Sequence, residues 1–476
     1  MRAAPSRTSV LALVAVLALA LILRLAWLAH ADTRLLPRSD PQYYHATAQN
    51  LADGRGYSVT LDQRGFVAGP GSESTAFWAP GYPLALAPLY KLFGAKTGVA
   101  RIFNAVAGAL TVLPVFYLGW RLGIADRTER PWPGGVAAAE ATGLVAAGLF
   151  AVAPSLVYWT ASLFSEPLFT LGVACTLAVA LWAGERRSLA GYFAAGVVLA
   201  ATAFVRSQGM LMIVPVAVLL LAALRDRPLA VAGGSVETTG LWPHIGARDL
   251  LRVAAPLAAS VALLVVPWAI RNDIAMGSPY LINDSLGYNL RLAHAPYAHG
   301  TSVPPQDLWD ERPGISFFQR EKFFAQVGTS RALTYAREHP GRELELAVRR
   351  IGYLSRSDSE AAVEWSQSLG DTPVAAADWW TLLGDLYYYP VVLLAVVALF
   401  AAPRTRVWLA LWSSIAAWGA LHLVFAGEPR YHVPLMPVVV VLAAATIVRV
   451  VDLSVRVVDL PRRAAPPATV PPEPAE

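Results

Sequence analysis

The sequence has little charge, almost no lysine and a single cysteine. Because Cys175 is alone, no disulfide can form within the chain. Charged residues make up only 15% of the 476 residues, whereas hydrophobic residues make up 56%. This composition excludes an ordinary soluble globular protein and predicts an integral membrane protein. Only three of the 38 basic residues are lysines, a bias that indicates the GC-rich genome of a bacterium.

The sequence also lacks several functional signatures. It has no solenoid repeat, no phosphate-binding glycine loop, no HExxH motif and no CxxC pair. The net charge of +5 does not call for a nucleic-acid partner, because arginine-rich cytoplasmic loops are the usual way in which membrane proteins fix their orientation.

Long apolar runs predict an all-α polytopic membrane protein with about ten transmembrane helices. The expected spans are 10–29, 99–122, 136–157, 163–183, 189–205, 210–224, 250–270, 386–402, 407–425 and 433–450. The first run follows a basic start, as in a cleaved signal peptide, but the many later spans favour a retained helix. Arg24 in this run either snorkels to the interface or faces the bundle as a functional residue.

The arginines fix an orientation for these spans. With a cytoplasmic N-terminus, every short inward loop carries at least two arginines and every short outward loop one or none. We therefore expect a membrane domain at 1–450, cytoplasmic termini, and two large extracytoplasmic segments at about 30–98 and 272–385. The proline-rich end, 451–476, has no periodicity and is expected to be a disordered cytoplasmic tail.

Each outer segment contains a run typical of an interfacial helix. The run 78–94, WAPGYPLALAPLYKLFG, is apolar but too short and too rich in proline to span a membrane. The run 338–354 places apolar residues on one side with arginines between them, which fits a helix on the bilayer surface or a solvated charged helix. Its apolar side is expected to consist of Leu344, Leu346, Val348, Ile351 and Leu354.

The polar stretch after the first span, SDPQYYHATAQNLADGRGY at 39–57, supplies the first candidate for catalysis. Its pattern predicts a short helix over 41–51, with Pro41 in the first turn and glycines at the end. Asp40 would be the N-cap of this helix, next to Tyr43 and Tyr44. It either only caps the helix or is a general base, since an acid held by helix amides stays ionised.

Four basic residues are expected near the outer membrane face, where the charge rule disfavours them. They are Lys91, Arg206, Arg271 and Arg430. Each alone could snorkel to lipid headgroups. Together they suit a lipid phosphate, because a guanidinium binds phosphate oxygens through two N–H groups and stays charged when partly desolvated.

Other polar residues lie close to these motifs. Glu166, at the start of the fourth span, could cap that helix, hydrogen-bond an acceptor, or share a divalent metal with Asp40, although two acids alone are weak evidence for a metal. His45 and His432 could bind sugar hydroxyls.

The motifs in this order resemble bacterial membrane glycosyltransferases of the GT-C superfamily. They are the outer acid followed by YY and NLADGRGY, then WAPGYPLALAPLYKLFG, RIFNAVAGALTVL, SEPLF, FVRSQGMLMIVP, PWAIRN and EPRYHVPLMP. The branch that looks nearest is family 39 with the lipopolysaccharide core galacturonosyltransferase-like proteins, relatives of protein O-mannosyltransferases and aminoarabinose transferases. The resemblance covers about 11–450.

The resemblance implies a GT-C fold, a polyprenyl-phosphate sugar donor, an inverting transfer on the outer face of the bacterial cytoplasmic membrane, and a lipid, glycan or protein acceptor. The family's catalytic acid maps onto Asp40, and its phosphate-binding residues align loosely with Lys91, Arg206, Arg271 and Arg430. Protein mannosyltransferases have Asp-Glu where this chain has Asp40-Pro41, which puts a protein acceptor in doubt. The expected substrate pocket contains Tyr43, Tyr44, His45, Tyr82, Glu166, Tyr431 and His432.

Two other classes compete with a glycosyltransferase. A transporter or flippase of a lipid-linked or anionic substrate would also suit many spans and a basic cavity, but the spans lack paired halves and mid-membrane acids. A membrane scaffold without catalysis would leave the grouping of Asp40, Glu166 and the basic residues unexplained.

Overall fold

The structure is a computed structural model that describes residues 4–31, 40–61, 67–124, 131–132, 136–225, 246–367 and 375–463. The first half contains α1 Arg7–His30, α2 Asp40–Ala52, β1 Ser58–Leu61, β2 Val67–Ser74, α3 Gly81–Phe93, α4 Thr97–Leu110, α5 Val112–Gly123, β3 Pro131–Trp132, β4 Val136–Ala137, α6 Ala138–Val152, α7 Pro154–Tyr158, η1 Trp159–Ala161, α8 Glu166–Arg186, α9 Leu189–Val205, η2 Ser207–Met212 and α10 Ile213–Arg225. The second half contains α11 Ala247–Met276, α12 Leu286–Ala293, α13 Gln306–Asp310, α14 Phe317–Phe323, η3 Phe324–Gly328, α15 Thr329–Glu338, α16 Pro340–Ser355, α17 Glu360–Gln367, α18 Ala375–Ala401, α19 Arg406–His422, η4 Pro429–Leu435 and α20 Met436–Arg463.

Long apolar helices form most of the molecule, as expected for a polytopic membrane protein. Within the described ranges, seven helices are long and apolar enough to cross a membrane, or up to eight if α6 and α7, bent by 57°, form one span. The expected number of ten is not confirmed. The helices α9 and α19 have only 17 residues each, and a helix of that length reaches about 25 Å, short of the roughly 30 Å hydrocarbon core.

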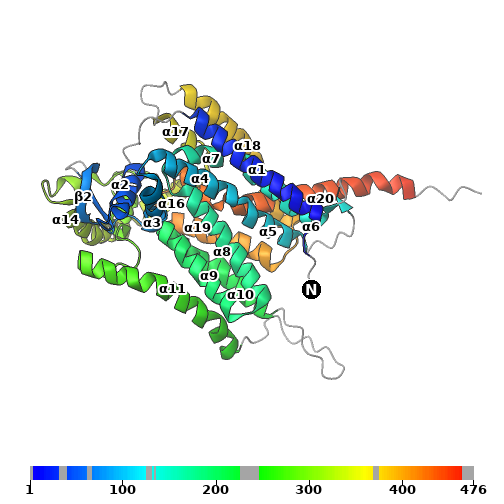
Figure 1. Cartoon of the computed structure of the whole chain (residues 1–476), viewed down its shortest axis with the longest axis horizontal. Helices are drawn as coiled ribbons and strands as arrows, with labels where there is room; N and C mark the ends of the chain where they lie inside the picture. Colours follow the sequence, from blue (N-terminus) through cyan, green and yellow to red (C-terminus); the bar gives the residue numbers. More distant parts are fainter. Residues whose placement is uncertain are drawn as a thin grey trace, which may run out of the picture.

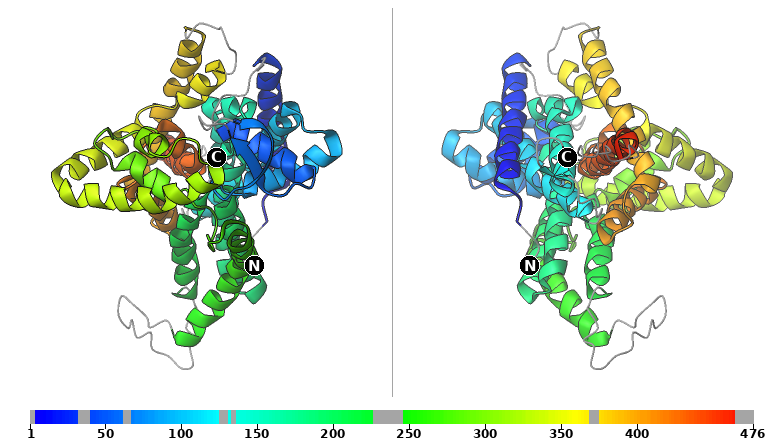
Figure 2. Two further views of the ribbon diagram at one scale, coloured as in Figure 1. Left: turned by 90° about the vertical axis from the view of Figure 1, so that its left-hand side faces the viewer. Right: turned by 90° about the vertical axis from the view of Figure 1, so that its right-hand side faces the viewer.

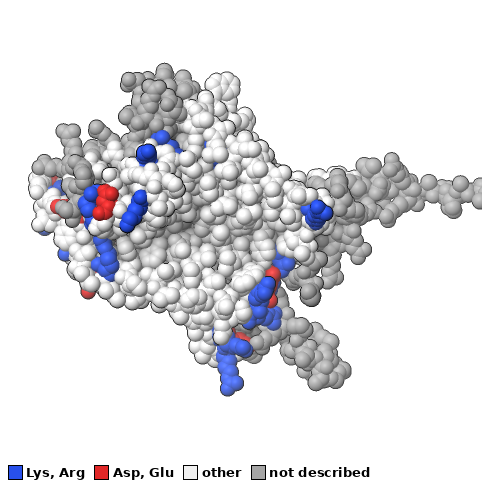
Figure 3. Space-filling model, in the orientation of Figure 1, with Lys and Arg blue, Asp and Glu red and all other residues white. Residues whose placement is uncertain are grey.

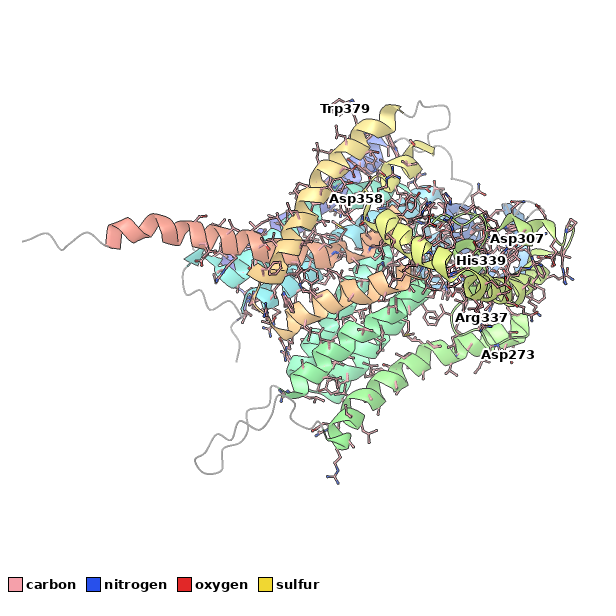
Figure 4. All side chains as sticks on the ribbon, turned by 180° about the vertical axis from the view of Figure 1, so that it is seen from behind. Asp273, Asp307, Arg337, His339, Asp358 and Trp379 are labelled. Atoms are coloured by element: carbon pink, nitrogen blue, oxygen red, sulfur yellow. The ribbon has the colours of Figure 1, made fainter. Side chains whose placement is uncertain are left out.

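The two polar segments lie together at one end of this bundle. The helices α2 and α3, the antiparallel β1–β2 pair and the helix α14 gather there (Figure 1). Asp273, Asp307, Arg337 and His339 of the second polar segment lie at the same end (Figure 4). Figure 2 shows α11 at the edge of the molecule. Charged side chains cluster at the ends of the bundle, with a largely uncharged surface between them (Figure 3).

Local signals set the helices that carry the expected motifs. The helix α2 begins at Asp40 and ends at Ala52, close to the predicted 41–51. The helix α3 corresponds to the expected interfacial run, and α8 begins at Glu166 with Pro167 in its first turn. Proline is tolerated there because the first-turn N–H groups have no intrahelical partner.

Two expectations about the second half need correction. The helix α16 forms where predicted, but its buried side chains are Leu346, Arg350 and Leu354, whereas Leu344 and Val348 are exposed. The buried face of α16 contains Arg350, which donates hydrogen bonds to main-chain carbonyls of two other segments. This charged residue, and not the apolar stripe alone, therefore decides which face of α16 is turned toward the protein. Of the expected tail at 451–476, residues 451–463 belong to α20, which ends at Arg463. Residues 464–476 lie outside the described ranges, so disorder there stays a prediction.

Candidate active site

The helix α2 is fixed by its buried face. Tyr44 and Ala48 are buried at i, i+4 spacing and belong to a core cluster with Tyr82 and Leu86 of α3. Residues four apart lie on the same face of a helix, so Asp40 is one turn before Tyr44 on the side that faces the rest of the polar end. Packing of α2 on α3 therefore sets where Asp40 points.

A cavity of about 730 Å³ opens at this end of the molecule. It is lined by Asp40, Tyr43, Tyr44, Phe77, Trp78, Ala79, Val205, Arg206, Ser207, Gln208, Asn283, Ser285, Tyr288, Asn289, Leu292, Ser302, Pro304, Gln306, Trp309, Asp310, Arg430 and Tyr431. The lining combines α2, the approach to α3, the α9–η2 junction, the segment 283–310 and η4. The first polar segment, the second polar segment and two helix junctions therefore build one site together.

Asp40 is held by two donors. The indole Nε1 of Trp78 donates a hydrogen bond to Oδ1 at 3.2 Å, and Nη1 of Arg430 lies 3.5 Å from Oδ2. About a quarter of the Asp40 side chain is exposed, since its relative accessibility is 26%. The site thus presents an oriented, accessible carboxylate, which is what a base requires.

Arg430 is not a free cation but the centre of an ion-pair network. Its Nε lies 3.1 Å from Glu428 Oε2 and 3.7 Å from Glu360 Oε1, in addition to the contact with Asp40. Its main-chain N–H also donates to Glu360 Oε2 at 3.0 Å. Burial raises the pKa of Glu360 to about 7 and the pKa of Glu364, on the same helix α17, to about 7. The charge of this network therefore depends on protonation near neutral pH.

Arg206 is also paired. Its Nη1 forms a buried ion pair with Glu166 Oε1. The ring of Tyr431 lies between the two arginines, with the guanidinium carbon of Arg430 at 5.1 Å and that of Arg206 at 5.9 Å from its centroid. The Tyr431 hydroxyl accepts a hydrogen bond from Arg430 Nη2 at 3.3 Å and contacts Ser302. The two guanidinium groups consequently share one wall of the cavity.

Two of the expected phosphate-binding residues lie elsewhere. Lys91 is exposed on α3 and does not line the cavity. Arg271 donates to the carbonyls of Thr75 at 2.8 Å and Tyr57 at 2.7 Å, and stacks on Trp268. Arg271 therefore ties α11 to the chain that leads into Trp78. Only Arg206 and Arg430 of the four expected basic residues come together in the cavity.

Some of the remaining expected pocket residues line the cavity and others lie outside its lining. Tyr43, Tyr44 and Tyr431 line the cavity, whereas Tyr82, His45, Glu166 and His432 do not. The Tyr82 hydroxyl is buried and donates to Asn104, and His45 Nδ1 lies 2.8 Å from the Tyr90 hydroxyl. Burial lowers the pKa of His45.

His432 points away from the cavity. Its Nδ1 lies 2.8 Å from the carbonyl of Leu354, its Nε2 lies 3.1 Å from Asp358 Oδ1, and its ring stacks on Tyr388. These contacts join η4 to the end of α16 and to α18. His432 thus positions the segment that carries Arg430.

Metal ligation by Asp40 and Glu166 together does not fit this geometry. Glu166 is engaged by Arg206 and does not line the cavity that Asp40 faces. Among the residues that the structure describes, no group of three or more His, Cys, Asp or Glu side chains could hold a metal ion. The cation that contacts Asp40 is the guanidinium group of Arg430.

Several cavity residues were not singled out from the sequence. Trp78 opens the WAPGYP motif, so its place in a quoted motif was a usable signal. Tyr288 and Trp309 also line the cavity, and Glu360 pairs with Arg430 from outside the lining; all three belong to the second polar segment. Their separation from Asp40 and Arg430 along the chain hides their proximity, which only tertiary packing creates.

A second, mainly apolar pocket of about 400 Å³ adjoins the cavity. The two share Ser207, Gln208, Asn283, Ser285, Asn289, Leu292, Ser302 and Tyr431. The further lining of the second pocket is mostly hydrophobic and comes from η2, the segment 281–286, the end of α19 and the residues just after it, with Met210, Leu211, Leu281, Leu286, Leu421 and Phe425. A polar cavity with an oriented acid is thus continuous with an apolar pocket.

Comparisons with known proteins agree with this architecture. No protein-family model and no curated protein matches the sequence. Among solved structures, the oligosaccharyltransferase of Archaeoglobus fulgidus in complex with Zn and sulfate matches with a TM-score of 0.51 and 16% identity, over 94% of this chain and 50% of that one. The same enzyme, AglB, in complex with an inhibitory peptide and a dolichol-phosphate matches with a TM-score of 0.51 and 14% identity, over 98% of this chain and 52% of that one.

The chain thus spans about half the length of these oligosaccharyltransferases. ArnT from Cupriavidus metallidurans bound to undecaprenyl phosphate also matches, with a TM-score of 0.37 and 15% identity, over 95% of this chain and 81% of that one. The expected fold is confirmed: the chain shares the GT-C fold of these oligosaccharyltransferase structures.

Proposed function

We propose that the chain is an inverting glycosyltransferase that moves a sugar from a polyprenyl-phosphate donor to an acceptor on the outer face of the bacterial cytoplasmic membrane. One observation carries this proposal: the carboxylate of Asp40 and the guanidinium groups of Arg430 and Arg206 face one cavity at the polar end of a GT-C bundle. Transfer from a sugar phosphate needs a base for the acceptor and cations for the leaving phosphate. This cavity provides both.

The apolar pocket beside the cavity supports a lipid-linked donor. A prenyl chain can lie against Met210, Leu211 and Leu421 while its phosphate enters the polar cavity at the shared residues. The similar oligosaccharyltransferase structure that holds a dolichol-phosphate adds support from a protein of the same fold.

The proposed reaction is a single displacement at the anomeric carbon. The acceptor hydroxyl oxygen attacks C1 of the sugar, the bond between C1 and the phosphate oxygen breaks, and Asp40 takes the hydroxyl proton. The phosphate leaves with its charge stabilised by the guanidinium groups, so it needs no proton. Attack from the face opposite the phosphate inverts the configuration at C1.

The ion pair between Arg430 and Asp40 links donor binding to the freedom of the carboxylate. A donor phosphate close to Arg430 competes for the guanidinium with Asp40, whose Oδ2 lies at the long distance of 3.5 Å. When the guanidinium binds the phosphate instead, Oδ2 of Asp40 becomes free to accept the hydroxyl proton of the acceptor.

The lining favours a glycan acceptor over a protein. Rings of Tyr288 and Trp309 and the side-chain amides of Asn283, Asn289 and Gln306 surround the cavity near Asp40. Aromatic faces pack on the C–H face of a sugar, and amides both donate to and accept from hydroxyl groups. Among lipid, glycan and protein acceptors, we therefore favour the sugar part of a glycan or glycolipid.

The decisive experiment measures transfer of radiolabelled sugar from synthetic polyprenyl-phosphate sugars to candidate glycans by the purified protein in detergent. Wild type is compared with Asp40→Asn and with Asp53→Asn, a matched change on exposed residue 53 just after α2, where the carboxylate pairs with Arg55. We expect transfer, or slow donor hydrolysis, that is lost in Asp40→Asn and kept in Asp53→Asn. Turnover by Asp40→Asn at the wild-type rate would rule out Asp40 as the base. Failure to bind any polyprenyl phosphate would favour the transporter or flippase alternative.

A further inference from the structure

Arg24 of α1 is completely buried inside the helix bundle, although its guanidinium carries a full charge. Its Nη1 donates to the carbonyls of Ala20 at 3.0 Å and Ala151 at 3.3 Å. Gly108 of α4 makes room for it, because a Cβ atom at this position would lie 2.7 Å from Arg24 Nε. The chain therefore accommodates this arginine in the bundle and does not let it snorkel to the interface.

A small pocket surrounds the guanidinium and has a volume of about 10 Å³. Arg24, Trp159, Glu166 and Thr170 line it. In the described part of the chain, these side chains have buried polar atoms without hydrogen-bond partners: Arg24 Nε and Nη2, Trp159 Nε1, Glu166 Oε2 and Thr170 Oγ1. Donors and an ionised acceptor from α1, η1 and α8 thus face the same small space.

Glu166 connects this pocket to the cavity. Its carboxylate oxygen Oε1 pairs with Arg206 on the cavity wall. Its other oxygen, Oε2, is buried without a hydrogen-bond partner among the described residues, and Glu166 lines the small pocket together with Arg24. A buried charge is costly unless it is paired. Glu166 is therefore placed to compensate two arginines, one in the bundle and one at the cavity.

We propose that Arg24, Glu166 and Arg206 form a charge triad, with one water molecule in the small pocket bridging Arg24 and Glu166. The pocket volume matches a single water, and its lining offers the two to four polar partners that a buried water needs. An anion would fit the donors but would be repelled by the Glu166 carboxylate. Water satisfies both kinds of group.

The triad gives Arg24 a positioning role in donor binding, and this part rests on the proposed function. A Glu166–Arg206 pair alone is neutral and offers a donor phosphate no net charge. With Arg24 behind it, the three groups carry one net positive charge, and Glu166 is held by both arginines. Arg24 thus lets Glu166 fix the Arg206 guanidinium without cancelling its attraction for phosphate.

The first test is thermal unfolding of the purified protein in detergent for Arg24→Gln, Glu166→Gln and the double variant. Glu166→Gln leaves two buried guanidinium groups uncompensated, and we expect it to lower Tm by about 5 to 10 °C. Adding Arg24→Gln removes one of them, so the double variant should be more stable than Glu166→Gln alone. If Glu166→Gln does not fold but the double variant does, the same rescue is shown. Additive effects would overturn the triad.

A matched pair controls for general damage to the bundle. Glu185 pairs with Arg121 between α5 and α8, away from the small pocket. Arg24→Gln combined with Glu185→Gln should show additive changes in Tm. Rescue of Glu185→Gln by Arg24→Gln would mean that removing Arg24 stabilises the protein by a route unrelated to Glu166.

The second test measures binding of undecaprenyl phosphate. We expect Arg24→Gln to weaken binding about tenfold and the double variant to recover it, because Arg206 then faces the cavity without a neutralising acid. Unchanged binding in Arg24→Gln would remove its positioning role. If wild type binds no polyprenyl phosphate, the proposed function fails, while the unfolding test still decides on the triad.

The third test separates water from an anion. Replacing chloride by gluconate in the buffer should leave Tm unchanged in wild type and in Arg24→Gln. A loss of stability in gluconate that is seen in wild type and absent in Arg24→Gln would overturn the bridging water and identify a bound chloride.

Discussion

The indole Nε1 of Trp78 donates a 3.2 Å hydrogen bond to Oδ1 of Asp40. Two rings hold the indole in place: Tyr43 stacks on it with centroids 3.8 Å apart, and Phe317 stacks on it with centroids 5.9 Å apart. Tyr43 comes from the helix of Asp40 itself, and Phe317 comes from α14 in the second polar segment. The proposed base is thus oriented by a tryptophan that both polar segments fix.

Trp78→Phe should lower kcat while leaving KM for the donor nearly unchanged. Phenylalanine keeps the stacking but removes the N–H group, and a lost hydrogen bond to a charged group is worth roughly 1.5 kcal/mol or more, about tenfold in rate. Steady-state kinetics that separate kcat from KM for the donor check this prediction.

Trp379→Phe is the matched control for that experiment. Trp379 lies at the exposed end of α18 (Figure 4) and does not line the cavity, so its change should alter neither kcat nor KM. A Trp78→Phe enzyme with the wild-type kcat would show that the indole only packs and does not orient the carboxylate.

Arg430→Ala should weaken donor binding about a hundredfold, and Arg430→Lys should weaken it less. Lysine keeps the positive charge among Asp40, Glu360 and Glu428 but loses the planar pair of N–H groups that suits phosphate. Arg430→Ala leaves the neighbouring carboxylates without a cation and can therefore misfold. Arg430→Lys keeps a cation there, so donor binding can still be measured on a folded protein.

Binding of a labelled polyprenyl phosphate measures the effect of these variants. Arg331→Ala serves as control, because Arg331 forms exposed ion pairs with Glu311 and Asp307 outside the cavity lining. Equal affinity of wild type and both folded Arg430 variants would show that Arg430 holds acids together and does not contact the donor.

The fold was largely predictable because its signals are local. Pro41 and the glycines that follow α2 define that helix, and Pro167 marks the start of α8. The buried face of α16 was not predictable, because Arg350 is buried by carbonyl groups that come from distant segments. A stripe of leucines indicates an amphipathic helix but does not tell which side a tertiary contact will cover.

The sequence singled out the charged residues Asp40, Arg206 and Arg430 and three tyrosines of the cavity lining, but not their partners. Asp40 and Arg430 are polar residues beside apolar spans, so the sequence alone marks them. Their partners are set by packing: 38 residues separate Asp40 from Trp78, 70 separate Arg430 from Glu360, and 390 separate Asp40 from Arg430. The sequence therefore indicated four basic residues near the outer membrane face, whereas the structure brings only Arg206 and Arg430 into the cavity and pairs both with acids.

Gly427→Ala should destabilise the protein by about 1–3 kcal/mol and reduce donor binding. A Cβ atom at Gly427 would lie 1.9 Å from the carbonyl oxygen of Arg350, so α16 must move away from the segment that leads into Arg430. Thermal unfolding and donor binding check the two effects.

Gly419→Ala is the control for this packing prediction. Gly419 lies in α19, and among the described residues no atom comes within 4 Å of the position that a Cβ atom would take there. Alanine should therefore leave stability unchanged or raise it slightly. Equal stability of Gly427→Ala and Gly419→Ala would show that the contact with Arg350 does not constrain the fold.

A buried pair of carboxyl groups joins the two polar segments beside the cavity. Glu321 of α14 accepts hydrogen bonds from the Thr75 hydroxyl and the Ala76 N–H, and the carboxyl group of Asp284 lies beside it. Burial raises the pKa of Asp284 to about 7 and the pKa of Glu321 well above its ordinary value. The Arg271 guanidinium and the neutral phenols of Tyr57 and Tyr280 face the pair and do not offset this burial.

Stability should therefore fall as pH rises from about 4 to about 7. In this window the folded protein keeps a proton on the pair that the unfolded chain has released, so each such proton removes about 1.4 kcal/mol of stability per pH unit. Below the ordinary pKa of both carboxyl groups, the folded and the unfolded protein bind the same number of protons. In that range the pair makes no contribution to the pH dependence of stability.

Thermal unfolding in detergent between pH 4.5 and 8, for wild type and Glu321→Gln, isolates the contribution of the pair. Glutamine keeps the shape and can donate to Asp284, but it has no proton to lose and it removes the repulsion between two carboxylates. The stability of Glu321→Gln relative to wild type should therefore rise as pH increases through this window. Parallel profiles for the two proteins would mean that Asp284 and Glu321 do not retain a proton together, and that the junction of the polar segments is held by the main-chain hydrogen bonds at Ala76 alone.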